Sequence, residues 1–227
     1  GHTEITYRLD RPIVVAALLG EVERERLVSP EGTRPGDALI LTKGIAIEGT
    51  AVLAREAGDS LSALGMSSED VEEARRCLFE PGISVVREAA AACEAVRVHA
   101  MHDPTEGGLA TALYEMAEAS GCGISVDTAA VNVLPITRRL CKATGLQPLG
   151  LLASGALLLA VAEGDAEQAI SAVRAVGISA RRIGSIQPPG GSVIMSGDTN
   201  GRPFPRFARD EVARFFSERA NGMEGPA

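Results

Sequence analysis

The sequence predicts an α/β (α+β) protein in which a mixed sheet lies between layers of helices. Segments with strand-like and helix-like apolar periodicity alternate along the chain, and hairpin signals are few. Hydrophobic residues make up 45% of the 227 residues, whereas aromatic residues make up 3% and Trp is absent, so the core must be aliphatic. This length suffices for one large domain, or for one domain and part of another.

The individual elements follow from periodicity and from the residues that interrupt it. Short apolar runs predict strands at 13–19, 38–42, 96–100, 122–126, 155–161, 180–186 and 192–195. Apolar residues spaced by three or four predict helices at 45–56, from 67, and at 84–94, 105–120, 135–144, 165–176 and 207–219. The strand–helix–strand piece at 155–186, with the strand at 192–195, resembles half of a ferredoxin-like unit.

The most informative motif is Met-His-Asp-Pro-Thr-Glu-Gly-Gly-Leu at 101–109, between an expected strand and an expected helix. Asp103 is placed to cap that helix, with Pro104 at its first position and Glu106 three residues after the cap. Capping does not explain the two glycines that follow, because each glycine within a helix costs about 1 kcal/mol relative to alanine. They indicate that a ligand or another backbone comes close, so this turn is a candidate anion site.

Three side chains of the motif are candidates for catalysis. A histidine side chain is the usual proton carrier near neutral pH, so His102 could move a proton. Glu106 could do the same if desolvated, or could hold Mg²⁺ together with Asp103. The alternative is that His102 only ends the strand, while Asp103 and Glu106 only cap the helix. His99 lies on the opposite face of the expected strand, so it is not expected to pair with His102.

A second candidate phosphate site is Lys43-Gly44, at the turn after the strand at 38–42. A lysine and a glycine at a strand-to-helix turn could meet phosphate, although the spacing of a Walker motif is absent. The alternative is that Lys43 is a surface lysine and Gly44 only a turn residue.

Charge and composition exclude several classes of function. The net charge is −8, and no basic run suggests nucleic acid as a partner. No apolar run reaches the length of a membrane span. The four scattered cysteines are typical of a reducing compartment, which predicts a cytoplasmic protein.

The motif at 102–109 resembles a loop of the AIR-synthase-like superfamily. Three further stretches resemble that superfamily in the same order along the chain: Gly-His-Thr-Glu at 1–4, Gly-Asp-Ala-Leu-Ile-Leu-Thr-Lys-Gly at 36–44, and Ala-Ser-Gly-Ala-Leu-Leu at 153–158. The superfamily includes aminoimidazole ribonucleotide synthetase, selenophosphate synthetase and the hydrogenase-maturation carbamoyl dehydratase. For the last of these stretches, the alternative is an ordinary turn before a strand.

The resemblance implies a fold, a domain division and a set of ligands. The fold would be the three-layer α/β/α structure of the superfamily's C-terminal domain. Residues 1–35 would be the tail of an N-terminal ATP-binding domain, 36–220 the C-terminal domain, and 221–227 a disordered tail. The cofactors would be ATP and Mg²⁺, and the protein would be a homodimer. Contacts to nucleotide or phosphate would come from Thr3, Glu4, Lys43, Gly44, Thr105, Gly107, Gly108, Ser154 and Gly155.

Three functional interpretations remain open. The first is the C-terminal part of an ATP- and Mg²⁺-dependent enzyme that activates an acceptor oxygen by phosphoryl transfer, inactive as this chain alone. The second is the hydrogenase-maturation carbamoyl dehydratase or a close relative, in which the resemblance implies a reactive cysteine at the extreme C-terminus. This sequence ends Met-Glu-Gly-Pro-Ala, which argues against that reaction unless a tail is missing. The third is a non-catalytic binding or dimerisation module. The acceptor, a small molecule or a protein, is not identified.

Overall fold

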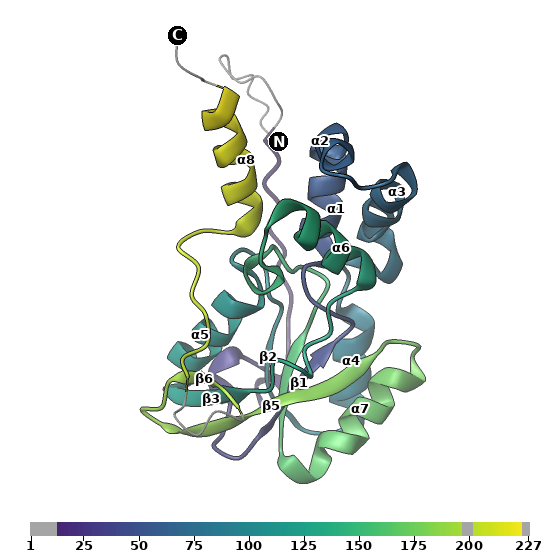
Figure 1. Ribbon diagram of the computed structural model, residues 1–227. Helices are drawn as coiled ribbons and strands as arrows, with labels where there is room; N and C mark the ends of the chain where they lie inside the picture. Colours follow the sequence, from purple (N-terminus) through teal and green to yellow (C-terminus); the bar gives the residue numbers. More distant parts are fainter. Residues whose placement is uncertain (1–12, 197–201, 224–227) are drawn as a thin grey trace.

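The computed structural model describes residues 13–196 and 202–223, with side chains described up to Arg219. A six-stranded sheet with the order β2-β4-β1-β5-β3-β6 forms its centre (Figure 1). Neighbouring strands are antiparallel except for β3 and β6, which are parallel. The strands are β1 (Ala38–Thr42), β2 (Val98–His102), β3 (Cys122–Val126), β4 (Leu158–Val161), β5 (Ala180–Pro189) and β6 (Val193–Met195).

Eight α-helices accompany the sheet in the described ranges. They are α1 (Ile47–Glu56), α2 (Gly58–Ala63), α3 (Ser68–Arg76), α4 (Val86–Ala95), α5 (Gly108–Ser120), α6 (Pro135–Thr144), α7 (Ala166–Ala175) and α8 (Glu211–Met223). Single turns of 3₁₀- or π-helix lie at Arg24–Arg26, Pro30–Gly32, Leu78–Gly82, Pro148–Gly150 and Glu163–Asp165.

Helices cover both faces of the sheet, which confirms the predicted three-layer α/β/α arrangement. The central strand β1 is buried along its whole length, and its residues alternate between the two faces. Leu39 and Leu41 pack in the same cluster as α5, whereas Ile40 packs in the cluster that contains α4 and α7. Because β1 has a helix layer on each side, its sequence is an uninterrupted apolar run.

The predicted half of a ferredoxin-like unit is present as β4–α7–β5. Both strands of this piece are antiparallel to β1, which lies between them, so they are parallel to each other. A helix that joins two parallel strands across an intervening strand is the split β-α-β arrangement.

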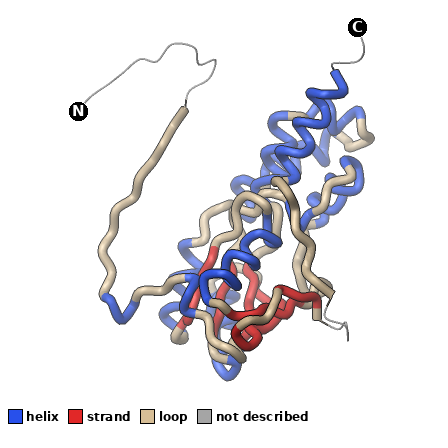
Figure 2. Tube along the Cα trace, turned by 90° about the vertical axis from the view of Figure 1, so that its left-hand side faces the viewer, coloured by secondary structure: helices blue, strands red, loops and turns tan. Residues whose placement is uncertain are grey.

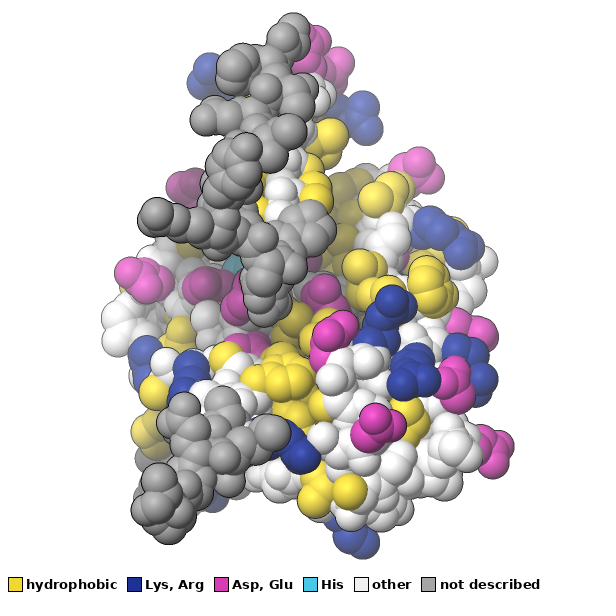
Figure 3. All heavy atoms as spheres, turned by 90° about the horizontal axis from the view of Figure 1, so that it is seen from above, with side chains coloured by type: hydrophobic (Ala, Val, Ile, Leu, Met, Phe, Trp, Pro, Cys, Tyr) yellow, Lys and Arg dark blue, Asp and Glu magenta, His cyan; other side chains and the backbone are white. Residues whose placement is uncertain are grey.

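A third apolar cluster joins α1, α2, α3, α6 and α8 beyond one end of the sheet, at the top of Figure 1. Its buried members include Leu53 of α1, Val71 of α3, Leu140 of α6 and Phe215 of α8. Viewed from above, apolar side chains gather across the middle of this end, and acidic and basic ones alternate on the right (Figure 3). These helices therefore stand over the edge of the sheet at which β1 ends.

The predictions for the segment 13–19 and for the last helix were wrong. Residues 13–19 form no strand but an extended loop that runs apart from the body of the molecule (Figure 2). Their large apolar side chains are 69–99% exposed, since no described strand pairs with them. The last helix, α8, begins at Glu211 rather than at 207 and continues through Met223, past the expected end at 219. The helix α2 and the turn Leu78–Gly82 were not predicted at all.

Candidate functional site

The predicted site residues that lie within the described ranges gather at one edge of the sheet. Since β1 and β2 both run antiparallel to β4, their carboxyl ends meet there, beside the amino end of β4. Lys43 follows β1, His102 ends β2, and Ser154 and Gly155 precede β4. Thr3 and Glu4 lie outside the described residues.

Thr105 connects the 102–108 loop to the segment that precedes β4. Its carbonyl oxygen accepts hydrogen bonds from the amide of Ala153 (3.2 Å) and from that of Gly108 (3.0 Å). Thr105 is half-buried, whereas Asp103 and Glu106 are exposed. The loop is therefore held by its backbone, while the two carboxylates are exposed.

The predicted capping box was wrong. The N-cap of α5 is Gly107, which has φ 75° and no side-chain cap, so the helix begins five residues after Asp103. Asp103, Pro104 and Glu106 belong to the loop before the helix. Because Gly107 and Gly108 both have positive φ, the chain enters the helix through two left-handed residues rather than through an extended cap.

The sequence left two reasons open for the glycine pair, a nearby ligand or a nearby stretch of backbone, and the structure places protein atoms close to both glycines. A Cβ on Gly108 would lie 2.6 Å from the carbonyl oxygen of Leu149 and 2.8 Å from that of Leu151. A Cβ on Gly107 would lie 2.1 Å from Oγ1 of Thr111. The close approach that requires Gly108 is thus made by another stretch of backbone, the 149–151 segment.

An acidic side chain already lies at the N-terminus of α5. The amide of Gly107 donates to Oδ2 of Asp210 (2.7 Å), and the amide of Val212 donates to Oδ1 (2.7 Å). One carboxylate therefore caps α5 and α8 together, as the positive ends of two helix dipoles favour. Burial raises the pKa of Asp210 above its ordinary value, while hydrogen bonds from three backbone amides, those of Val212, Gly107 and Leu152, act in the opposite direction.

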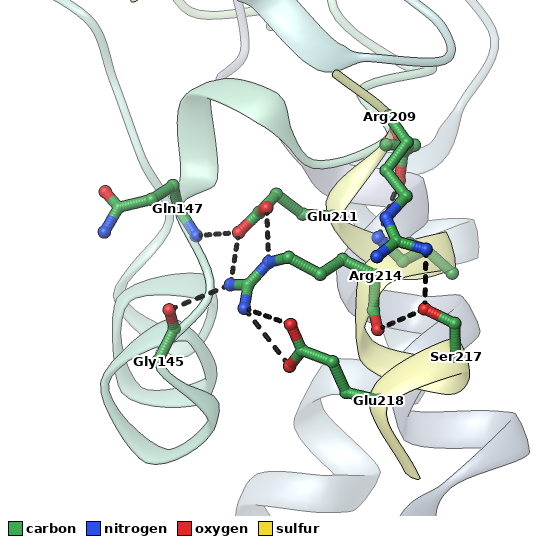
Figure 4. Close-up of polar contacts among 9 residues, drawn as sticks. Gly145, Gln147, Arg209, Glu211, Arg214, Ser217 and Glu218 are labelled. Atoms are coloured by element: carbon green, nitrogen blue, oxygen red, sulfur yellow. Dashed lines mark hydrogen bonds and ion pairs between the residues drawn. The ribbon is translucent and has the colours of Figure 1, made fainter. Parts of the chain in front are cut away.

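The helix α8 is fixed in this position by a buried carboxylate (Figure 4). Glu211 accepts from the amide of Gln147 (2.7 Å), and Arg214 donates to both of its oxygens (2.7 and 2.8 Å). Arg214 also bonds Glu218 and the carbonyl oxygen of Gly145, which ends α6. Burial by itself raises the pKa of Glu211, but the hydrogen bonds from Arg214 and Gln147 outweigh it and lower the pKa below the ordinary value.

The two histidines of β2 are engaged separately, as their spacing predicted. Nε2 of His102 lies 2.8 Å from Oε2 of Glu115, on the surface side of α5. Nδ1 of His99 lies 2.9 Å from both carboxylate oxygens of Asp37. Over the described ranges, no group of three or more His, Cys, Asp or Glu side chains is arranged to hold a metal ion.

Lys43 is not a surface lysine. It is 8% exposed, and its ammonium group contacts Oε1 of Glu88 (2.8 Å) and the carbonyl oxygens of Ser84 (2.6 Å) and Gly155 (3.1 Å). An ammonium group has three donors, and these three contacts use them. Gly44 follows at the turn and is buried against Asn132. Lys43 therefore joins the segment before β4 to α4, and would meet phosphate only if this ion pair opened.

Sequence reasoning missed two acidic residues of this region. Asp210 could have been found as a polar residue directly before a helical pattern, but the helix was expected to start earlier. Glu88 lies in an alanine-rich helix, where a glutamate ordinarily faces solvent, and local sequence offers no signal of its burial.

The sheet order, the helix layers and the glycine-rich turn define the C-terminal domain of an AIR synthase-related protein. The family described as "AIR synthase related protein, C-terminal domain" matches residues 34–196, and the chain belongs to this family. None of the helices in the described ranges is long and apolar enough to cross a membrane.

The chain is similar to several proteins of hydrogenase maturation. It is 33% identical over 182 residues to the carbamoyl dehydratase HypE of Cupriavidus necator, covering 78% of this chain and 48% of that protein. It is 30% identical over 175 residues to a putative hydrogenase expression/formation protein of Methanocaldococcus jannaschii, covering 77% and 48%. The chain thus spans about half the length of the curated relatives it matches.

Solved structures of hydrogenase maturation proteins share the fold. A HypE crystallised with ATP matches with a TM-score of 0.60 and 27% identity, over 86% of this chain and 57% of that one. HypE of E. coli matches with a TM-score of 0.64 and 24% identity, over 83% and 55%.

Proposed function

We propose that this chain is the C-terminal part of an ATP- and Mg²⁺-dependent enzyme that activates an acceptor oxygen by phosphoryl transfer. The observation that carries the proposal is the meeting of three family motifs at one edge of the sheet, through Thr105, Gly155 and Lys43. In the proposed division, residues 1–35 belong to the N-terminal ATP-binding domain, 36–220 form this domain, and 221–227 form a tail. The family match begins at residue 34, next to the first of these boundaries.

The residues at this edge fit a nucleotide that carries its own cation. Asp103 and Glu106 offer two exposed carboxylates, which suit partial coordination of Mg²⁺ already bound to phosphates. ATP would supply the transferable phosphoryl group. His102, whose Nε2 is held by Glu115, could take a proton from the acceptor. Ser154, which is half-buried, would contact a phosphate. Gly44, Gly107, Gly108 and Gly155 are buried, and the amides of Gly107 and Gly108 already donate to Asp210 and Thr105, so these glycines shape the loops rather than contact phosphate.

The direct binding test is calorimetric titration of the 227-residue chain with Mg²⁺-ATP. Saturable micromolar binding would support a nucleotide site made largely by this chain. Absence of binding, followed by binding of the longer protein, would assign the nucleotide to the N-terminal domain. If neither form bound, the phosphoryl-transfer proposal would be wrong and a non-catalytic module would remain.

The residue test is Asp103→Asn in the full-length protein. We expect turnover to fall about tenfold or more, which is the size of many single-group losses in catalysis. Because Asp103 does not cap α5, the melting temperature should not change. Asp127→Asn, directly after β3, is the matched control: it removes the charge of an exposed carboxylate that, within the described residues, accepts a hydrogen bond from Ala129 alone. Equal turnover of the two variants would remove Asp103 from the proposed chemistry.

A second candidate is the carbamoyl dehydratase of hydrogenase maturation or a close relative. The names of the relatives that are 30–33% identical favour it. In that case the gene should encode a cysteine at the extreme C-terminus, and replacing this cysteine should abolish the reaction. We further propose a homodimer in the cytoplasm, which sedimentation and cell fractionation would test.

A further inference from the structure

A second cavity lies between β2, the end of α4 and the chain that leads into β1. Its volume is about 320 Å³, at the lower end for pockets that hold small molecules. It is lined by residues between 25 and 34 and between 93 and 99, none of which belongs to the candidate site. One of them, His99, contacts Asp37 directly before β1. The cavity therefore lies near the amino end of β1, whereas the candidate site lies at its carboxyl end.

His99 occupies an irregular position in β2. The register of β2 against β4 shifts between Val98 and Ala100, so the strand has a β-bulge at His99. Bulges aim a side chain out of the regular alternation and are frequent beside functional sites. The turn Pro30–Gly32 packs against the same point, since a Cβ on Gly32 would lie 2.0 Å from the carbonyl oxygen of His99. The bulge and the turn together shape the wall of the cavity.

The ring of His99 is buried and its orientation is fixed from one side. Its side chain is 8% exposed, and Nδ1 lies 2.9 Å from both carboxylate oxygens of Asp37. Asp37 is itself held in place, because its Oδ2 accepts from the amide of Arg34 (2.8 Å). A carboxylate only accepts hydrogen bonds, so the contact assigns a proton to Nδ1 and leaves Nε2 as the other end of the ring.

Nε2 of His99 is the atom that can meet a ligand. Within the described ranges it has no hydrogen-bond partner, and it is not among the side-chain atoms there that are sealed from solvent without one. Because His99 lines the cavity, the open side of its ring is the cavity. A protonated ring would donate from Nε2 to an oxygen of a ligand.

The charges of the lining residues favour an anion. Arg26, Arg34 and Arg97 line the cavity against one carboxylate, that of Glu25. Three positive charges less one leave an excess of two, in a chain whose net charge is −8. A protonated His99 beside Asp37 adds nothing to this excess. A phosphate monoester carries about two negative charges at neutral pH, and guanidinium groups match its oxygens in pairs.

We infer that this cavity binds a small phosphate monoester through Nε2 of His99 and the three arginines. Asp37 is a positioning residue that holds the ring. The apolar lining residues Leu27, Val28 and Val96 would contact the organic part of the ligand. The inference does not rest on the proposed phosphoryl transfer, because the cavity shares no residue with that site.

The test is a titration of the 227-residue chain, with ¹⁵N-labelled histidine, by inorganic phosphate at fixed pH and constant ionic strength. The chain has three histidines, so NMR can follow the ring signals of His99 and His102 separately. We expect a saturable shift of the His99 signals, and at least about tenfold weaker binding of acetate, which carries a single charge. Equal affinity for acetate, or a shift confined to His102, would overturn the inference.

Arginine variants separate this cavity from the general charge of the surface. Arg97→Gln, at an exposed position, should weaken phosphate binding about tenfold, because one charge-assisted hydrogen bond is lost. Arg24→Gln is the matched control: it removes the same charge from the turn that contains Arg26, but Arg24 does not line the cavity. Equal losses in the two variants would contradict a specific site.

Cys93 gives a second readout that does not depend on histidine. It lines the cavity and is exposed, whereas the other three cysteines are buried. Phosphate should slow alkylation of Cys93 by the neutral reagent iodoacetamide, because a bound anion crowds the thiol and disfavours its thiolate. The slowing should saturate together with the His99 shift and weaken in Arg97→Gln. Unchanged alkylation at saturating phosphate would place the anion outside the cavity and overturn the inference.

Discussion

Gly108 shows at the scale of one residue why the start of α5 requires glycine. We predict that Gly108→Ala lowers the free energy of unfolding by about 3 kcal/mol or more, because its Cβ would meet two carbonyl oxygens in addition to the cost of positive φ. Gly121→Ala, also at positive φ but with open space around it, should cost about 1–2 kcal/mol. Urea unfolding measures both, and equal losses would show that the close approach is not rigid.

The ion pair of Lys43 and Glu88 contributes to stability by keeping a buried carboxylate next to a cation. We predict that Lys43→Met lowers the free energy of unfolding by about 3–5 kcal/mol, because it leaves a fully buried carboxylate without a cation. The double variant Lys43→Met/Glu88→Leu should lose less than the single variant, since no uncompensated charge remains. Additive losses in denaturant unfolding would mean that the two side chains do not interact.

At the scale of an element, the position of α8 is held by the polar contacts of Glu211 and Arg214. We predict that Arg214→Ala releases this helix, which would appear as faster hydrogen exchange of its amides while the sheet stays protected. Arg219→Ala is the control, because among the described residues the contact of Arg219 is with the ring of Phe215, at 5.2 Å from the guanidinium carbon to the ring centre. If both variants exchanged alike, the Glu211–Arg214 contacts would not anchor the helix.

Docking of α8 should also depend on pH. The pKa of Glu211 is lowered in the folded chain, so its contribution to stability is complete above its unfolded pKa, near 4.5. This contribution is lost as pH falls through the lowered, folded pKa. The protection of the α8 amides, measured relative to the intrinsic exchange rate at the same pH, should therefore fall in acid, and Glu211→Gln should remove most of this pH dependence.

Elements with local signals were predicted well. β1, β3 and α6 have the predicted bounds, because the signals act within each segment: a short apolar run in each strand, and in α6 a proline at the first helical position with Gly145 at the end. The start of α5 was misplaced because Asp103, Pro104 and Glu106 satisfy the local rules of a cap. The actual cap, Asp210, lies 103 residues away in the sequence, and no local rule reaches it.

At the scale of the whole molecule, the site was predictable only in part. The resemblance indicated its motifs, but Thr105, Gly155 and Lys43 meet because β4 pairs antiparallel with both β1 and β2, and no sequence pattern predicted this strand order. The burial of Lys43 was not predictable, because it requires Glu88 from α4 and two carbonyl oxygens from other segments.

The segment 13–19 predicts association of the molecule with another chain. Leu18 and Leu19 are 99% and 96% exposed, and such a run of apolar side chains is favoured to pair. We expect Leu18→Asp/Leu19→Asp to shift the chain towards the monomer in sedimentation velocity. Leu64→Asp, at a 44% exposed position next to α2, should leave association unchanged. An identical monomer fraction in all three proteins would exclude this segment from the contact.

The shared cap of α5 and α8 has a consequence for synthesis of the chain on the ribosome. Gly107 leaves the ribosome 103 residues before Asp210, which at about 5–20 residues per second is a delay of about 5–20 s. During that interval the nascent chain exposes a helix start whose amide has no carboxylate to bind. Chaperones and proteases that recognise unfinished chains would thus meet this loop, which carries the candidate residues His102, Asp103 and Glu106, before its C-terminal cap arrives.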